Sequence, residues 1–229
     1  MLIFALDSTA VTAAVAICRD EQLLASYTLH NGNTHSETLL PMTETLFKEL
    51  SITAADIDLF ACTAGPGSFT GIRIGVAAAK GLAFGADKPA VGVSTLAAMA
   101  RNVAFADGLI VCAMDARRKQ VYNALFSFEN GGIQRLCPDR ALSVADLCAE
   151  LKELGEPFAL SGDGIPEFLA HAVDLTPAPI SPLLTAQNAV SVAKCAHRAY
   201  LRGERCTDAE LAPVYLRLPQ AERERLEKM

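Results

Sequence analysis

A glycine-rich stretch at residues 64–84 constrains the fold of this chain more than any other segment. An apolar run of strand length precedes it, and residues that favour helix follow it. Gly65, Gly67 and Gly71 let the backbone turn where side chains would obstruct it, and Pro66 fixes one torsion. The stretch therefore predicts a strand, a defined glycine turn and a helix. Amides of such a turn attract phosphate, but the spacing matches neither the phosphate loop nor the dinucleotide fingerprint.

The predicted helix carries two stripes of small residues. The members of each stripe recur at intervals of four, as Gly71, Gly75 and Ala79 and as Ala77, Gly81 and Gly85. Glycine inside a helix costs about 1 kcal/mol relative to alanine, so close packing is expected to offset it. Stripes without large side chains let another helix approach closely. The spacing leaves two alternatives open, a contact within the same domain or an interface between subunits.

Length, charge and cysteine content limit the class of protein. The 229 residues, 51% of them hydrophobic, are ample for a core and allow two small domains. The net charge of −6 disfavours tight nucleic-acid binding by this chain alone. The seven cysteines include no Cys-x-x-Cys pair and fit reduced, buried thiols. Asp7 interrupts the apolar N-terminus and no run of eighteen apolar residues occurs, so we expect a cytoplasmic protein that does not enter membranes.

Three short apolar segments open the chain, at residues 2–6, 13–18 and 23–29, with polar breaks between them. This pattern predicts three consecutive strands in an antiparallel meander. Residues 34–37, Thr-His-Ser-Glu, fit a capping box that begins a helix.

The second half of the chain repeats the order of the first. The apolar strand at residues 109–115 ends in aspartate like the one at residues 2–7, and residues 158–164 pass from strand into glycine turn like residues 60–67. This agreement predicts an α/β fold of two tandem βββαβα units with mixed sheets. We expect an N-terminal subdomain, a C-terminal subdomain and a charged tail, at residues 1–104, 105–217 and 218–229.

Asp7, Ser8 and Thr9 follow the first strand and resemble the phosphate-facing turn of actin-like ATPases. The same residue types are ordinary turn formers. We therefore favour a structural turn, keep these three as candidates for nucleotide contact, and expect no cofactor on this chain.

Eleven consecutive residues, from Gly65 to Gly75, resemble the signature of the glycoprotease-like, peptidase M22-like family. Three further segments resemble the family in the same order: His35-Ser-Glu, Asp115-Ala-Arg and Pro213-Val-Tyr-Leu-Arg. The resemblance covers nearly the whole chain. It implies the actin-like ATPase fold, also called ASKHA or ribonuclease H-like.

Catalytic members of this family carry His-x-x-x-His on one helical face, where the pair holds a metal ion. Counted from the Val-Gly-Val strand, the two positions here are Thr95 and Met99. Threonine is a poor ligand for such a site and methionine a soft one. The resemblance therefore implies a noncatalytic member, with no metal and no catalytic residues.

For such a member the resemblance implies a scaffold and activator in tRNA threonylcarbamoyladenosine synthesis. It would pair with the catalytic member TsaD, recruit the ATPase TsaE, and support threonylcarbamoyl transfer to N6 of adenosine 37 in tRNAs that read ANN codons. ATP and metal are expected on TsaD, and tRNA is expected to be contacted only through the complex. Without TsaD, the pairing surface could form a homodimer.

The pairing surface is expected on the helices at residues 34–50 and 72–84, whose small residues suit a tight contact. The candidate interface residues are His35, Leu39, Leu46, Ile72, Gly75, Val76, Ala79, Leu82 and Ala83. His35, beside the helix start, also fits a structural hydrogen bond.

Two alternatives come from other classes of protein. One is an active enzyme, either a metallopeptidase or a small-molecule kinase that uses the strand-end residues Asp7 and Asp115. The other is a nucleotide-binding scaffold without turnover. For Asp115 and Arg117 themselves, a solvated surface pair is the simpler interpretation.

Overall fold

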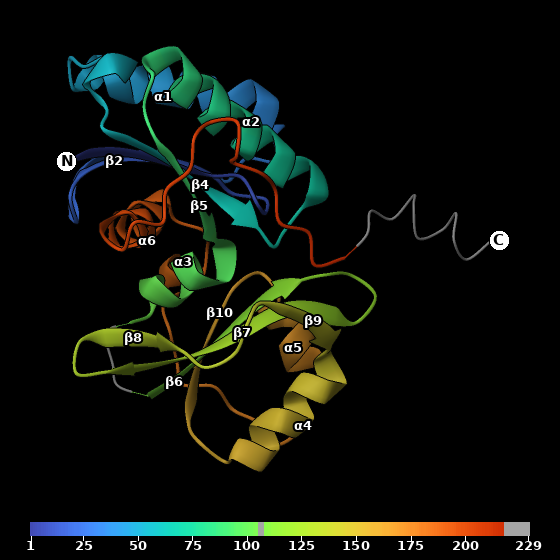
Figure 1. Ribbon diagram of the computed structural model, residues 1–229. Helices are drawn as coiled ribbons and strands as arrows, with labels where there is room; N and C mark the ends of the chain where they lie inside the picture. The colour runs from blue at the N-terminus through green and yellow to red at the C-terminus, as the bar shows by residue number, and fades with distance from the viewer. Residues whose placement is uncertain (105–107, 218–229) are drawn as a thin grey trace.

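The computed structural model describes residues 1–104 and 108–217, which form two lobes, one above the other in Figure 1. The first lobe is built on a five-stranded sheet in the order β3-β2-β1-β4-β5. β1 and β2 pair antiparallel, as do β2 and β3, so the predicted meander is confirmed. β4 pairs parallel with β1 and with β5. The strands span Leu2–Asp7 (β1), Ala13–Arg19 (β2), Gln22–Leu29 (β3), Leu59–Gly65 (β4) and Ala90–Ser94 (β5).

Helices cover both faces of this sheet. α1 and α2 lie side by side on one face, and α6 packs with α3 on the other (Figure 1). Alternation along β1 explains this, because Phe4 and Leu6 point to the first face while Ile3 and Ala5 point to the second. The helices span His35–Glu49 (α1), Phe69–Ala86 (α2), Thr95–Asn102 (α3) and Ala189–Leu201 (α6), with a 3-10 turn at Ala54–Asp56 (η1).

The second lobe repeats the arrangement on a sheet in the order β10-β6-β7-β8, with β9 also paired to β7. α4 and α5 cover one face, and α3 packs on the other face, between the lobes. The sequence patterns predict neither the four-residue β9 nor the seven-residue α5. The elements span Gly108–Asp115 (β6), Gln120–Glu129 (β7), Gly132–Arg135 (β8), Arg140–Ser143 (β9), Val144–Leu154 (α4), Phe158–Ser161 (β10), Ile165–His171 (α5) and Pro182–Leu184 (η2).

The C-terminal part of the chain returns to the first lobe. α6 buries Val192, Ala193 and Ala196 against the first sheet. Leu211 lies in the core beneath α1 and α2. The prediction of a single C-terminal subdomain at residues 105–217 is therefore wrong, because the segment from α6 onward completes the core of the first lobe. The predicted tail at residues 218–229 lies outside the described residues.

Serine side chains cap the start of three of the α-helices. Ser68, Ser94 and Ser143 each accept a hydrogen bond from a backbone amide in the first turn of α2, α3 and α4. α1 differs from the predicted capping box: within the described residues the Thr34 side chain caps no amide of the helix, and its Oγ1 accepts from the Ser36 hydroxyl at 3.4 Å. In the described parts of the chain, no helix has the length and apolar character needed to cross a membrane.

Candidate functional site

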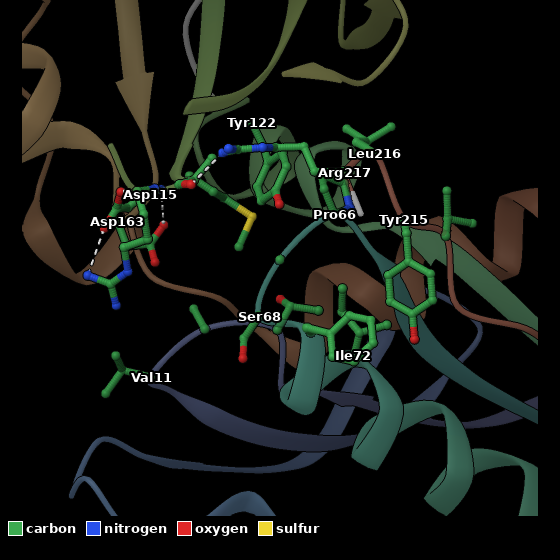
Figure 2. Close-up of a pocket in the computed structure, with 18 residues that line it drawn as sticks. Val11, Pro66, Ser68, Ile72, Asp115, Tyr122, Asp163, Tyr215, Leu216 and Arg217 are labelled. Atoms are coloured by element: carbon green, nitrogen blue, oxygen red, sulfur yellow. Dashed lines mark hydrogen bonds and ion pairs between the residues drawn. The ribbon is translucent and has the colours of Figure 1, made fainter. Parts of the chain in front are cut away.

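The ends of four strands converge on the cleft between the lobes (Figure 2). Thr9 follows β1 and Pro66 follows β4 in the first lobe, while Asp115 ends β6 and Asp163 follows β10 in the second. Together with neighbouring residues they line a cavity of about 360 Å³. Parallel strands bring their carboxyl ends to the same edge of a sheet, which is where α/β folds place their binding crevices. This cleft is the candidate functional site.

Residues 211–217, which we call the closing arm, run along the cleft and supply part of its lining (Figure 2). The arm joins the first lobe where Val214 N donates to Ala64 O at 2.7 Å. It reaches the second lobe where Arg217 Nη1 donates to Ala116 O at 2.7 Å. The closing arm therefore connects both walls of the site.

Tyr215 fixes the closing arm against the start of α2. Its hydroxyl accepts a hydrogen bond from Arg73 Nε at 2.8 Å, and its ring centroid lies 4.8 Å from that of Phe69. The Arg73 guanidinium lies 3.9 Å from the Phe69 centroid. Aromatic and cation–π contacts of this kind contribute about 0.5–1.5 kcal/mol each. The sequence patterns did not indicate Tyr215 as a cleft residue, and its only signal is its place in the Pro213-Val-Tyr-Leu-Arg segment.

Asp7, Ser8 and Thr9 are almost fully buried and mainly build the turn after β1. Asp7 Oδ1 accepts from Thr9 N at 2.8 Å and from Thr9 Oγ1 at 2.6 Å, while Ser8 Oγ donates to Gly71 O at 2.9 Å. Burial raises the pKa of the Asp7 carboxyl above its ordinary value. Of these three candidates for nucleotide contact, Thr9 lines the cavity. Asp7 and Ser8 face the interior, where they hold the turn and α2 together.

The first stripe of small residues on α2 faces the interior of its own lobe. A Cβ on Gly71 would overlap Ser8 O, and a Cβ on Gly75 would overlap Ser8 Oγ. Ala79 is fully buried in the same core. Of the two alternatives left open by the spacing, this stripe therefore makes the contact within the domain.

The predicted interface residues mostly lie in this core as well. The exceptions are His35 and Leu82, which are half-buried. The other seven are buried: Leu39, Leu46, Ile72, Gly75, Val76, Ala79 and Ala83. Their assignment to a partner-facing surface is therefore wrong, because α1 and α2 turn this side towards the sheet.

The second stripe lies on the opposite side of α2, at the surface. Ala77, Gly81 and Gly85 are exposed, and apart from the neighbouring residues and backbone of α2 itself, no atom of the described residues lies within 4 Å of a Cβ placed on Gly81. Two large apolar side chains stand on the outer sides of the same pair of helices: Leu40 on α1 is 55% exposed and Phe84 on α2 is 75% exposed. We call this surface the outer helix face.

His35 makes a structural contact at the start of α1. Its Nε2 lies 2.6 Å from Ala10 O, so the ring ties the helix to the turn after β1. Its Nδ1 is buried and has no hydrogen-bond partner among the described residues. This geometry fits the structural hydrogen bond expected from its place beside the helix start.

Comparison with known proteins identifies the family. A family model described as TsaD, tRNA N6-adenosine threonylcarbamoyltransferase, matches residues 29–223. The tRNA threonylcarbamoyladenosine biosynthesis protein TsaB of Bacillus subtilis is 33% identical over 97% of this chain and 96% of its own length. The chain is a TsaB-like member of the TsaD family.

Solved structures agree with this assignment. A Pseudomonas aeruginosa protein described by its similarity to the peptidase YeaZ superposes with a TM-score of 0.81 and 26% identity, over 94% of this chain and 99% of that one. The ethanolamine utilization protein EutJ of Carboxydothermus hydrogenoformans matches in fold alone, with a TM-score of 0.51 and 13% identity, over 85% and 89% of the two chains. The predicted actin-like ATPase fold is confirmed.

In this TsaB-like chain, the positions expected for a histidine pair are part of the packing between the lobes. Thr95 and Met99, at the start and middle of α3, are buried. Met99 packs in the core of the second lobe, and the Gln187 side-chain amide donates to its sulfur at 3.9 Å. Within the described residues, no cluster of three His, Cys, Asp or Glu side chains could hold a metal ion.

Asp115 and Asp163 supply two carboxylates to the second-lobe wall of the cleft. Asp115 pairs with the exposed Arg117 at 3.1 Å, as the surface-pair interpretation predicts. Asp163 Oδ1 accepts from Asp115 N at 3.2 Å. Desolvation at the cavity wall raises the pKa of the Asp163 carboxyl, and the nearby Asp115 charge adds to this. The sequence patterns do not identify Asp163 as a cleft residue. It lies in the glycine turn at residues 158–164, whose likeness to the turn at residues 60–67 is the signal that could have found it.

Proposed function

We propose that this chain is the noncatalytic partner of a TsaD-like enzyme in tRNA threonylcarbamoyladenosine synthesis. It pairs with a TsaD-like protein, takes part in recruiting a TsaE-like ATPase, and supports transfer of the threonylcarbamoyl group to N6 of adenosine 37 in tRNAs that read ANN codons. ATP and the metal ion belong to the TsaD-like subunit. The assembled complex binds the tRNA, and the likeness to TsaB over nearly the full length of both chains supports this role.

The outer helix face is the observation that favours pairing. Large exposed apolar side chains such as Phe84 and Leu40 are costly in water, and small neighbours such as Gly81 leave room for a partner helix to approach. The face belongs to α1 and α2, the two helices expected to pair from the family resemblance. The same face could support a homodimer of this chain when the TsaD-like partner is absent.

The residues at the histidine-pair positions and after β1 favour a noncatalytic role. Thr95 and Met99 lack the ligand chemistry of a histidine pair. The Asp7 carboxyl, which a kinase of this fold would need at its phosphates, is buried and accepts two hydrogen bonds from Thr9. These features support a scaffold over the alternative of an independent kinase or peptidase.

A reconstitution tests the proposal. Its components are a TsaD-like protein, a TsaE-like ATPase, ATP, threonylcarbamoyl adenylate and unmodified tRNA, and modified adenosine 37 is measured with and without this chain. We expect modification to require this chain, while the chain alone modifies no tRNA and hydrolyses no ATP above background. Unchanged modification after its omission would reject the proposal.

A matched pair of variants locates the pairing surface. Phe84→Asp places a charge on the outer helix face, and Val173→Asp places one on the second lobe at a side chain that is 69% exposed. We expect Phe84→Asp to weaken binding of the TsaD-like protein at least about tenfold, because a hot-spot aromatic side chain is lost and a charge is desolvated. Val173→Asp should bind like the unchanged chain in the same calorimetric titration.

A further inference from the structure

The turn between β6 and β7 has an unusual backbone. Arg117, Arg118 and Lys119 follow one another with φ values of +64°, +56° and +57°. Each L-residue in this left-handed region costs roughly 1–2 kcal/mol, because its Cβ crowds the next carbonyl oxygen. Three in succession, none of them glycine, form a strained turn, and such strain persists only where the surroundings enforce it.

Hydrogen bonds on both sides hold this turn in place. Arg117 N donates to Asp115 Oδ1 at 2.7 Å, and Gln120 N donates to Arg117 O at 3.2 Å. Lys119 O accepts from Val144 N at the start of α4, at 3.0 Å. The closing arm adds the bond from Arg217 to Ala116 O. The turn is thus a rigid part of the second lobe.

The result is a row of three cations, of which Arg117 lines the cleft. Arg117, Arg118 and Lys119 are all exposed, and the Arg117 side chain is 87% exposed. Arg73, on α2 of the first lobe, is also exposed and donates to the Tyr215 hydroxyl of the closing arm. The three cations follow one another in a chain whose net charge is −6, so they are a local feature and do not reflect the overall composition. Asp115 on the same wall pairs with Arg117.

Two aromatic side chains share the cavity lining with Arg117. Tyr122 and Tyr215 line the cavity, and Tyr215 is 39% exposed (Figure 2). Cations that contact phosphates beside rings that stack on bases are the combination by which proteins hold unpaired RNA. An acidic protein segment would use the cations but has no bases to stack on the rings.

We propose that the turn at residues 117–119 binds backbone phosphates of the tRNA in the assembled complex. This inference rests on the proposed function and makes it more specific, because it gives this subunit a direct contact with the substrate RNA. The turn holds the backbone that carries the cations in place before binding, so less backbone entropy is lost when the RNA arrives. The contact positions the RNA and reads no sequence.

The test is a salt titration of tRNA binding. The double variant Arg118→Gln, Lys119→Gln removes two cations and leaves the pair of Asp115 and Arg117 in place. The control, Arg19→Gln with Lys152→Gln, removes two exposed cations from other parts of the chain. Binding of fluorescently labelled tRNA by the complex with TsaD-like and TsaE-like proteins is measured by anisotropy at several salt concentrations, after circular dichroism has shown that the variants fold.

We expect the turn variant to weaken tRNA binding about tenfold at low salt and to reduce the slope of log affinity against log salt by about 1.5, as the loss of two phosphate contacts requires. The control variant should change the affinity and the salt slope less than the turn variant does. Unchanged affinity and slope in a complex that still assembles would overturn the inference. Loss of assembly with unchanged tRNA binding by the isolated chain would make the turn a protein contact and would also overturn it.

If the proposed function itself is wrong, the experiment gives a different result. In that case the unchanged chain itself fails to form the complex in gel filtration. The same salt titration is then run on the isolated chain at low salt, where a difference in slope between the turn variant and the control supports the phosphate contact, and equal slopes reject it.

Discussion

The carbonyl oxygen of Val214 occupies the space that a Cβ on Gly65 would fill. Gly65 ends β4 with a φ of +129°, a conformation that L side chains rarely adopt. The glycine turn therefore serves a purpose that its spacing does not reveal. It lets the closing arm lie directly against the strand end, where Val214 N bonds to Ala64 O.

Substitution of this glycine should weaken the whole fold. We expect Gly65→Ala to lower the free energy of unfolding by at least about 2 kcal/mol, since both the backbone conformation and the space are unsuitable for a Cβ. Gly81→Ala is the matched control, because it lies in a helix with open space and should raise stability by about 1 kcal/mol. Urea unfolding measures both. Equal midpoints for the two variants would contradict this account.

The orientation of α2 can be tested with one substitution at two positions. Ala79→Arg puts a charge into a fully buried site and should cost more than about 3 kcal/mol of folding free energy. Ala77→Arg lies on the outer helix face, so we expect near-normal stability but at least about tenfold weaker binding of the TsaD-like protein. Thermal unfolding and a binding titration distinguish them. A folded Ala79→Arg protein with normal core packing would show that α2 is oriented differently.

The buried Asp7 carboxyl should make stability depend on pH. Its raised pKa means that the folded state binds the proton more tightly than the unfolded chain, so this group lowers stability as pH rises from about 4 through the folded pKa. Asp7→Asn keeps the Oδ1 acceptor for Thr9 and carries no charge. We expect the variant to gain stability over the unchanged protein as pH rises. Urea unfolding midpoints of both proteins from about pH 4 to 8 measure this. If the variant's advantage in midpoint became smaller as pH rises, this account would be wrong.

A glycine in the strained turn at residues 117–119 should raise the stability of the fold. Lys119→Gly removes the Cβ from a residue with φ of +57° and open surroundings. We expect stability to rise by up to about 1 kcal/mol, while tRNA binding by the complex weakens because a cation is lost. Arg19→Gly, at an ordinary exposed position, should not be stabilising. A drop in stability for Lys119→Gly would show that the turn is not strained.

Sequence periodicity is sufficient to predict most strands and helices of this protein, because apolar runs and polar breaks are sharp. It could not orient α2. Both stripes of this helix consist of small residues, so neither carries the hydrophobic contrast that separates a buried face from an exposed one. The choice depends on Ser8, which lies more than sixty residues earlier in the chain and contacts the stripe that contains Gly71 and Gly75.

The cleft was predictable only in part. Strand-end residues such as Asp7 and Asp115 can be placed from the pattern, but whether a side chain faces the cavity depends on local hydrogen bonds. Thr9 satisfies the Asp7 carboxyl inside the turn, whereas Asp163 remains at the cavity wall. The path of the closing arm depends on contacts between distant residues, such as Arg73 with Tyr215, which no local pattern contains.

The return of α6 to the first lobe bears on how the protein folds as it is synthesised. Residues 108–184 can emerge from the ribosome and form the second lobe as an inserted unit, since its strands pair among themselves. The first lobe must wait for residues 189–211, because one face of its sheet stays uncovered until Val192 and Ala196 arrive. Until those residues arrive the nascent chain exposes an apolar sheet face, and surface of this kind favours aggregation.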